Sequence, residues 1–261
     1  NLDPASVGVA STGVIGRYLD LDLIRDQCSR VAPLLARSTD AEAAAARAIM
    51  TTDTFAKRIA YEVKLEGGKS FRIGAMAKGA GMINPAMATM LCFITTDAEV
   101  DQETMQSMLN ECTHTTFNAA SVDGETSTND TVLIMANAQS GAFHRAAFKG
   151  TLEAFMLYLA KEMVRDGEGA TKLVTYKVTV AKDKLEAEVC AKALSNSLLV
   201  KTALFGQDPN WGRIASTVGA SGITCDEATL SIWFDDVCVY KQGELLFDEK
   251  LEPRAAAVMQ K

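Results

Sequence analysis

Histidine, proline and positive charge are scarce in this sequence. Two histidines and five prolines occur among 261 residues, and acidic residues outnumber basic residues by 33 to 26. A histidine-based metal centre or a Ser-His-Asp triad therefore has little support, and we expect His114 and His144 to be surface or capping residues. The formal net charge of -7 and the absence of a basic cluster argue against nucleic acid or an anionic membrane as a partner.

Long apolar runs and closely spaced cysteines are also missing. No run approaches the roughly 20 apolar residues that a membrane-spanning helix needs, and no secretory signal is recognisable. None of the six cysteines belongs to a CxxC pair and several lie in apolar runs, so we interpret them as reduced core residues. The sequence predicts a cytoplasmic protein, or a protein of an organellar matrix in a eukaryote, with no metal site.

Hydrophobic periodicity predicts an alternation of helices and strands. Helical spacing of apolar residues predicts helices at about 21–35, 41–50, 101–116, 151–164 and 187–198. Two-residue alternation and apolar runs predict strands at 7–16, 89–95, 132–136 and 173–180, and hairpins at 55–76 and 230–247, the second of which turns at Gln242-Gly243. The turn-forming residues at the start of 208–213 predict a loop there. This order supports an α/β protein with a main domain at 1–170 and a smaller C-terminal α/β domain at 171–261.

The middle of the chain changes character at Thr89. A loop rich in glycine, which also contains Pro85, gives way there to the apolar run 90–94. A residue that is held by a buried strand on one side and by a pliable loop on the other suits a nucleophile, although threonine is also common at the start of a strand. Lys78, between Ala77 and Gly79, has the small neighbours that let a lysine approach a ligand, or it is a solvated loop residue.

Other polar segments have both a functional and an ordinary structural interpretation. Gly13 and Gly16 allow backbone N–H groups to form an oxyanion cradle, and a turn capped by Thr12 is the alternative. The segment 116–131 is dense in hydroxyls, amides and carboxylates, and a polar active-site wall or a structural turn is favoured over metal binding by its acidic residues Asp123, Glu125 and Asp130. Glu168, between glycines, is available to bind a cationic group or is a plain turn carboxylate.

Several motifs, taken together and in order, closely resemble the ornithine acetyltransferase family, called ArgJ. They are Ser11–Gly16 (STGVIG), Ile49–Thr54 (IMTTDT), Lys78–Ile83 (KGAGMI), Met87–Leu91 (MATML), Ser127–Thr131 (STNDT), Asp166–Lys172 (DGEGATK) and Asp208–Arg213 (DPNWGR). Members of this family are N-terminal-nucleophile enzymes that cut themselves before a threonine. The resemblance implies a layered αββα-type sandwich and scission between Ala88 and Thr89, giving an α chain that ends at Ala88 and a β chain that begins at Thr89.

The resemblance also implies a reaction, in which Thr89 takes the acetyl group of N-acetylornithine and passes it to glutamate. Thr12 and Gly13 would form the oxyanion hole, and Thr51, Lys78, Thr89 and Glu168 would contact the substrates. The free α-amine of Thr89 would act as local base, which fits a chain with so few histidines. The resemblance implies no cofactor, leaves acetyl-CoA open as a second acetyl donor, and implies an α2β2 assembly of the two chains.

The chain also departs from the family pattern at its ends. Family members have a considerable segment before STGVIG, and a C-terminal tail that contributes an Asn and a terminal Thr or Ser to the substrate site. This chain begins with Asn1 and ends at Lys261, so we expect a truncated C-terminal domain or a piece of a longer protein. A related hydrolase, an acetyltransferase that acts on another amine, and an inactive relative stay open as alternatives.

Overall fold

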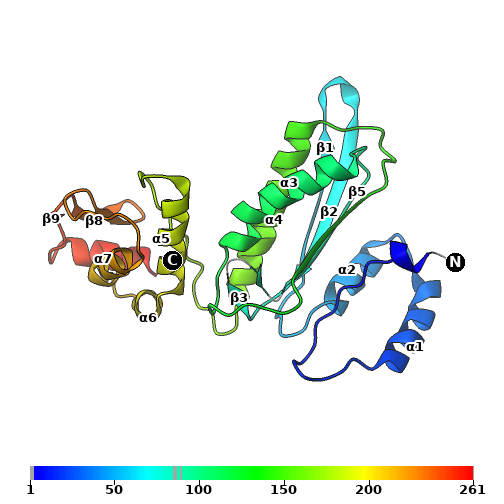
Figure 1. Ribbon diagram of the computed structural model, residues 1–261, viewed down its shortest axis with the longest axis horizontal. Coiled ribbons are helices and arrows are strands. Elements are labelled where there is room, and N and C mark those ends of the chain that lie inside the picture. Colours follow the sequence, from blue (N-terminus) through cyan, green and yellow to red (C-terminus); the bar gives the residue numbers. More distant parts are fainter. Residues whose placement is uncertain (1–2, 85–86, 89, 261) are drawn as a thin grey trace. The chain divides into compact units, whose positions relative to one another are not determined.

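The structure is a computed structural model that describes residues 3–84, 87–88 and 90–260. The chain forms two compact units, Asn1–Ala170 and Thr171–Lys261, which are described separately (Figure 1). Both units contain helices and strands, so the expected α/β class is confirmed.

The first unit contains four α-helices and six strands among the described residues. The helices are α1 (Leu21–Val31), α2 (Thr39–Ala48), α3 (Gln102–Thr115) and α4 (Arg145–Arg165), with 3-10 turns at Pro4–Ser6, Ala32–Leu34, Glu66–Gly68 and Phe117–Ala119. The strands are β1 (Lys57–Lys64), β2 (Ser70–Lys78), β3 (Ile83–Asn84), β4 (Met87–Ala88), β5 (Leu91–Thr96) and β6 (Thr131–Ala136).

A four-stranded sheet in the order β1-β2-β5-β6 organises this unit. Strands β1 and β2 form the predicted antiparallel hairpin, which turns through Gly67 and Gly68, both at a φ of 80°. Such positive φ values favour glycine, so the sequence signal for this turn has a direct physical cause. Strand β5 runs antiparallel to β2 and parallel to β6, and it carries the apolar run that follows Thr89.

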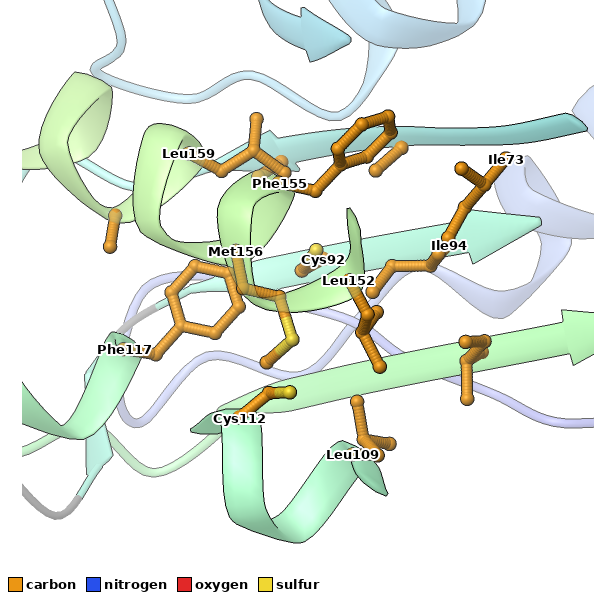
Figure 2. Close-up of a cluster of buried hydrophobic side chains, with 14 of the residues drawn as sticks. Ile73, Cys92, Ile94, Leu109, Cys112, Phe117, Leu152, Phe155, Met156 and Leu159 are labelled. Atoms are coloured by element: carbon orange, nitrogen blue, oxygen red, sulfur yellow. The ribbon is translucent and has the colours of Figure 1, made fainter. Parts of the chain in front are cut away.

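Helix α4 packs on β1 and β2 and against α3, and the core lies between these helices and the sheet (Figure 2). Phe155, Leu159, Ile73 and Ile94 are each at most 1% exposed. Burial of one such side chain contributes about 1.5–3 kcal/mol, so this cluster holds β2 and β5 rigidly in place. The sheet thereby fixes the two strands that lead into and out of the segment 79–90.

The predicted helices form, with shifted ends. Helix α4 begins at Arg145, earlier than predicted, and its cap is the predicted kind of residue: the His144 Nδ1 accepts a hydrogen bond from the Ala147 amide at 3.3 Å. Helix α1 is capped by Asp20, whose carboxylate accepts from the Leu23 amide at 2.9 Å. None of the residues of α1 is buried, so its apolar face has no cover in the described part of the chain.

Two predicted strands and one predicted loop are wrong. Residues 7–16 and 173–180 form no strand, because two-residue alternation makes a strand only where a neighbouring strand pairs with it. In the second of these segments Tyr176 and Val178 pack on a helical cluster instead. The predicted loop at Asp208–Arg213 ends early, since Asn210 caps a helix that begins at Trp211.

The second unit combines four helices with a small antiparallel sheet. The helices are α5 (Lys184–Asn196), α6 (Leu198–Phe205), α7 (Trp211–Ala220) and α8 (Leu251–Val258), and the sheet has the order β7 (Ser231–Phe234), β8 (Val237–Lys241) and β9 (Glu244–Leu245). The predicted turn at Gln242-Gly243 joins β8 to β9 with φ values of 51° and 88°. Trp211 stacks on Tyr240 with ring centroids 5.4 Å apart, which anchors α7 to the sheet.

The expectations about membrane-spanning helices and cysteines can be compared with the structure. In the part of the chain that the structure describes, no helix is both long and apolar enough to cross a membrane. All six cysteines are free thiols; Cys92, Cys112 and Cys190 are buried as expected, whereas Cys28 and Cys225 are exposed.

Candidate active site

The turn after α2 is tied to the end of β2 by one buried carboxylate. Asp53 Oδ1 accepts hydrogen bonds from Lys57 Nζ at 2.7 Å and from the Gly79 amide at 2.8 Å, and its Oδ2 accepts from the Thr51 amide at 3.1 Å. Burial opposes ionisation of Asp53, but these donors outweigh it and hold the pKa of the carboxyl below its usual value. Asp53 therefore fixes Thr51 beside Lys78, the last residue of β2.

The same turn is joined to the end of α4 by a buried ion-pair triad. Lys57 Nζ lies 2.7 Å from Asp53 Oδ1 and 2.5 Å from Asp166 Oδ2, and all three side chains are at most 2% exposed. Asp166 also accepts hydrogen bonds from the amide and the hydroxyl of Thr54. Although burial opposes ionisation, Lys57 and Thr54 keep the pKa of Asp166 below its usual value. The triad positions the Gly167-Glu168 turn, which follows Asp166 directly.

Lys78 is buried but has few partners. It is 1% exposed, and its Nζ donates to the Thr51 Oγ1 at 3.3 Å. Burial lowers the pKa of Lys78, the negative charges of Asp53 and Asp130 act against that shift, and Lys57 adds to it. Thr51 Oγ1 is the sole hydrogen-bond acceptor of this ammonium group among the described residues, which leaves N–H groups available for an anionic ligand.

Glu168 lies against the peptide that follows Lys78. Its amide donates to the Ala80 carbonyl at 2.8 Å, and a Cβ placed on Gly81 would come within 3.0 Å of its Oε1. A side chain on Gly167 would meet Val122 at 2.9 Å. Gly81 and Gly167 therefore allow the close approach that a larger side chain would prevent. The Glu168 carboxylate lies near Gly81, at one end of the short peptide 78–81, and Lys78 is at the other end.

The segment that contains the expected cleavage site begins as a small hairpin. Strands β3 and β4 pair antiparallel, with Ile83 opposite Ala88. The Asp123 carboxylate accepts hydrogen bonds from the amides of Met82 at 2.6 Å and Ile83 at 3.0 Å, and Asn84 Nδ2 donates to the Gly124 carbonyl at 2.7 Å. The polar segment predicted as an active-site wall thus holds the entry to this hairpin.

The exit from the segment is held by Asp130. Its Oδ1 accepts from the Met90 amide at 3.0 Å, and the Thr131 amide donates to the Met90 carbonyl at 3.0 Å. Asp130 Oδ2 is buried and has no hydrogen-bond partner in the part of the chain that the structure describes. Burial raises the pKa of Asp130 to about 6, against the lowering effects of the Met90 amide, the Lys78 charge and the Ser127 hydroxyl.

The structure describes most of the predicted site residues but not all of them. It places Thr51 in contact with Lys78, and Glu168 against Ala80 and Gly81, two and three residues after Lys78. Thr89, predicted as the nucleophile, lies outside the described residues, so the cleavage at Ala88/Thr89 stays a prediction.

Thr12 and Gly13, predicted as the oxyanion hole, lie in the irregular segment before α1. Gly13 approaches Leu19, whose Cδ2 would lie 3.6 Å from an added Cβ. Among the described residues no hydrogen bond joins Thr12 or Gly13 to the other predicted site residues, and their role is untested. The positive φ expected in this loop occurs at Gly16, where it is 82°.

Sequence reasoning missed the residues that hold the site in place. At Lys57 the sequence shows only the alternation that is typical of a strand, and nothing that predicts a buried ion pair. Asp53 lies within the IMTTDT motif, for which the sequence predicts a role only at Thr51, and Asp130 lies in the segment predicted as a polar wall or turn rather than a metal site. Among the described residues no group of three or more potential ligands is arranged for a metal ion. Hydrogen bonds from backbone N–H groups that are distant in sequence give Asp53 and Asp130 their structural role instead.

Comparison with known proteins identifies relatives over nearly the whole chain. A family model described as "ArgJ family" matches residues 1–261. The chain is 55% identical over 251 residues to a Wolinella succinogenes protein named "Arginine biosynthesis bifunctional protein ArgJ", covering 96% of this chain and 62% of that protein. It is 48% identical over 261 residues to a Methanocaldococcus jannaschii protein named "Glutamate N-acetyltransferase", covering 97% of this chain and 64% of that protein.

A solved structure shares the fold. The crystal structure of the arginine biosynthesis bifunctional protein ArgJ from Bacillus halodurans superposes with a TM-score of 0.60 at 39% identity, covering 64% of this chain and 80% of that chain. The present chain spans between three fifths and two thirds of the length of the curated relatives given above.

Proposed function

Because the chain belongs to the ArgJ family, we propose that the protein transfers an acetyl group from N2-acetylornithine to glutamate. The names of the relatives, glutamate N-acetyltransferase and a bifunctional protein of arginine biosynthesis, support this assignment. The observation that carries it is the convergence of the Thr51 hydroxyl, the buried Lys78 ammonium and the Glu168 carboxylate around one short peptide. Opposite charges at the two ends of a peptide match substrates that carry both a carboxylate and an amine.

Thr89 is the nucleophile in this proposal. Self-cleavage between Ala88 and Thr89 frees the α-amine of Thr89, which accepts the proton of its own hydroxyl while the oxygen attacks the acetyl carbonyl. The C–N bond of the acetylamine breaks, the proton passes to the departing amine, and an acetyl-threonine ester remains. The amine of glutamate then attacks that ester, and Thr89 regains its hydroxyl.

The charged residues orient the substrates in this scheme. Lys78 binds a substrate carboxylate with the N–H groups that Thr51 leaves available, and burial strengthens that attraction. Glu168 binds a substrate amino group. The backbone at Thr12 and Gly13 stabilises the oxyanion of the tetrahedral intermediate, an effect typically worth about 2.7–4 kcal/mol for one donor.

The remaining expectations belong to the same proposal. The two fragments stay associated as α and β chains of an α2β2 assembly in the cytoplasm, and the reaction needs no cofactor. Acetyl-CoA is left open as a second acetyl donor, which the name "bifunctional" of the Wolinella relative makes worth testing.

The test joins mass analysis to an assay. Intact mass of the purified protein is expected to give two fragments that separate at Ala88/Thr89, and N-acetylornithine with glutamate is expected to yield ornithine and N-acetylglutamate. Thr89→Ala should abolish cutting and transfer together. Thr95→Ala is the matched control, because Thr95 is an exposed residue of β5, and it should retain both.

Two results would overturn the proposal. One is an uncut chain that transfers acetyl groups at an undiminished rate in Thr89→Ala. The other is release of acetate without N-acetylglutamate, which would make the protein a hydrolase of the same family.

A further inference from the structure

Asp130 is an exception among the hydrogen-bonded carboxylates of the first unit. The residue is partly buried; one of its oxygens accepts from the Met90 amide at 3.0 Å, and the other is buried with no hydrogen-bond partner among the described residues. A buried acceptor without a donor is unfavourable, and more so if it is charged. The chain therefore keeps an unfavourable group at this position.

The neighbouring carboxylates show that the fold can satisfy such groups. Asp53 and Asp166 share Lys57; Asp53 also accepts from two backbone amides, and Asp166 accepts from the amide and the hydroxyl of Thr54. Asp123, in the same polar segment as Asp130, uses both oxygens to bind the amides of Met82 and Ile83. Asp130 is thus left incomplete in surroundings where other carboxylates are complete.

The contact of Asp130 leads directly to Thr89. The Met90 nitrogen is bonded to the carbonyl carbon of Thr89, so the hydrogen bond from Asp130 holds the peptide that follows the proposed nucleophile. Three covalent bonds separate the nitrogens of residues 89 and 90, and by standard bond lengths these atoms lie within about 4 Å of each other. A carboxylate at 3.0 Å from one nitrogen is therefore within electrostatic reach of the other.

We propose that Asp130 is a positioning residue for Thr89: one oxygen fixes the peptide after Thr89, and the free oxygen receives the α-ammonium group of Thr89. This inference rests on the proposed function, since scission before Thr89 creates that amine. The incomplete hydrogen bonding of Asp130 then has a physical reason, because its missing donor is produced only when the chain is cut.

The role in the reaction is electrostatic. When the Thr89 hydroxyl proton moves to the α-amine and the oxygen bonds to the acetyl carbon, a positive charge develops on that nitrogen. A carboxylate beside it stabilises the charged form and makes the amine a stronger base. Asp130 itself neither gains nor loses a proton in this step, and the proton leaves with the amine product.

Other charges act on this pair and bear on its pH dependence. Lys78, at the end of β2, acts on Asp130 and opposes a positive charge placed beside it. Lys78 is in turn influenced by Asp53 and Lys57. Asp53 and Lys57 belong to the triad with Asp166, which has one ammonium group and two carboxylates and therefore adds negative charge.

The experiment compares Asp130→Asn with Asp123→Asn in the cut protein. Both changes replace a carboxylate of the same loop by an amide, but Asp123 binds the amides before the hairpin, away from Met90. The α-amine at residue 89 is titrated through the pH dependence of its trace labelling by acetic anhydride, read by mass analysis of the peptide that begins at Thr89. The kcat and KM of acetyl transfer are measured across the same pH range.

Asp130→Asn is expected to lower the pKa of that amine by about one unit, because an opposite charge nearby normally raises it. The kcat should fall by about 10- to 100-fold, and its acid limb should move to lower pH, with each KM within about twofold. Asp123→Asn should leave the titration and the pH profile at their wild-type positions. Asp130→Glu, which restores the charge, should recover part of the shift.

The outcomes separate this inference from the proposed function. An unchanged amine titration in Asp130→Asn overturns the role of Asp130 alone, as does an equal effect of Asp123→Asn or a change confined to KM. A cut protein without acetyl transfer overturns the proposed function, and the titration still decides the role of Asp130. An uncut wild-type chain overturns both.

Discussion

Two groups of charges in the first unit, the Lys57 triad and the pair of Lys78 and Asp130, differ in how completely their hydrogen bonding is satisfied. In the Lys57 triad the ammonium group contacts two carboxylates, and these carboxylates accept further N–H and O–H donors. Lys78 and Asp130 act on one another electrostatically, yet each leaves hydrogen-bonding capacity unused among the described residues. The first arrangement holds the chain together, and the second leaves charge available for chemistry.

The largest expected effect comes from breaking the satisfied triad. Lys57→Met removes the shared cation and leaves Asp53 and Asp166 buried side by side, so the free energy of unfolding should fall by about 3–5 kcal/mol. Urea unfolding measures this change. Lys64→Met, at the exposed end of the same strand, is the control and should stay within about 0.5 kcal/mol of wild type. A loss below about 1 kcal/mol for Lys57→Met would show that the triad is not structural.

A second change tests the pH dependence of the same triad. Asp166→Asn should cost about 2 kcal/mol at pH 7, because charge-assisted hydrogen bonds from Lys57 and Thr54 weaken. The pKa of Asp166 is lowered in the folded chain, so its contribution is complete above the unfolded pKa of about 4 and disappears as the pH falls through the folded value. Urea unfolding should give a larger difference from wild type at pH 7 than near pH 3. Equal differences would contradict the prediction.

On the functional side, Gly81→Ala should affect binding more than folding. The new Cβ would lie 3.0 Å from Glu168 Oε1, so the carboxylate must move away from the peptide that carries Lys78. We expect the KM of the amine-bearing substrate to rise about tenfold, which corresponds to roughly 1.4 kcal/mol.

Gly150→Ala is the matched control for this change. An added Cβ at Gly150, inside α4, has no atom within 4 Å, and the substitution should stabilise the protein by about 0.5–1 kcal/mol without altering KM. A wild-type KM in Gly81→Ala would exclude Glu168 from substrate binding.

The smallest expected effect is that of Asp130, whose contribution to stability changes with pH in the opposite direction from that of the triad. Burial raises the pKa of Asp130 to about 6, so between about pH 4 and pH 6 the folded chain binds more protons than the unfolded chain, and stability falls as the pH rises. The whole shift corresponds to about 3 kcal/mol, which solvent screening of this partly exposed residue reduces to about 1 kcal/mol.

Asp130→Asn should therefore stabilise the chain by about 1 kcal/mol at pH 7 and by little at pH 4, as measured by urea unfolding. Destabilisation at pH 7 would show that Asp130 is a structural carboxylate, and it would remove the contrast between the Lys57 triad and the pair of Lys78 and Asp130.

Local sequence was sufficient for elements whose stabilising contacts are local. The β1–β2 hairpin was predictable because alternation and Gly67-Gly68 specify both its faces and its turn. The same alternation at 173–180 failed, since strand formation depends on a partner strand that the pattern does not reveal.

The candidate site shows the same limit. Lys78, Thr51 and Glu168 were predicted through the family resemblance; the structure gives a hydrogen bond between Lys78 and Thr51 and places Glu168 against Gly81. The role proposed for Asp130 rests on one hydrogen bond from Met90, 40 residues away in sequence, and on burial of one carboxylate oxygen that no local pattern encodes. A residue of this kind becomes visible only when the fold gives its neighbours.

Trapping of the acetyl-enzyme tests the central claim most directly. The protein is incubated with N-acetylornithine in the absence of glutamate, quenched in acid and analysed by intact mass. We predict that the fragment beginning at Thr89 gains the mass of one acetyl group, that one ornithine is released for each active site, and that added glutamate removes the acetyl group. Turnover by a chain that is uncut, or whose Thr89 fragment never carries the acetyl group, would contradict Thr89 as the nucleophile.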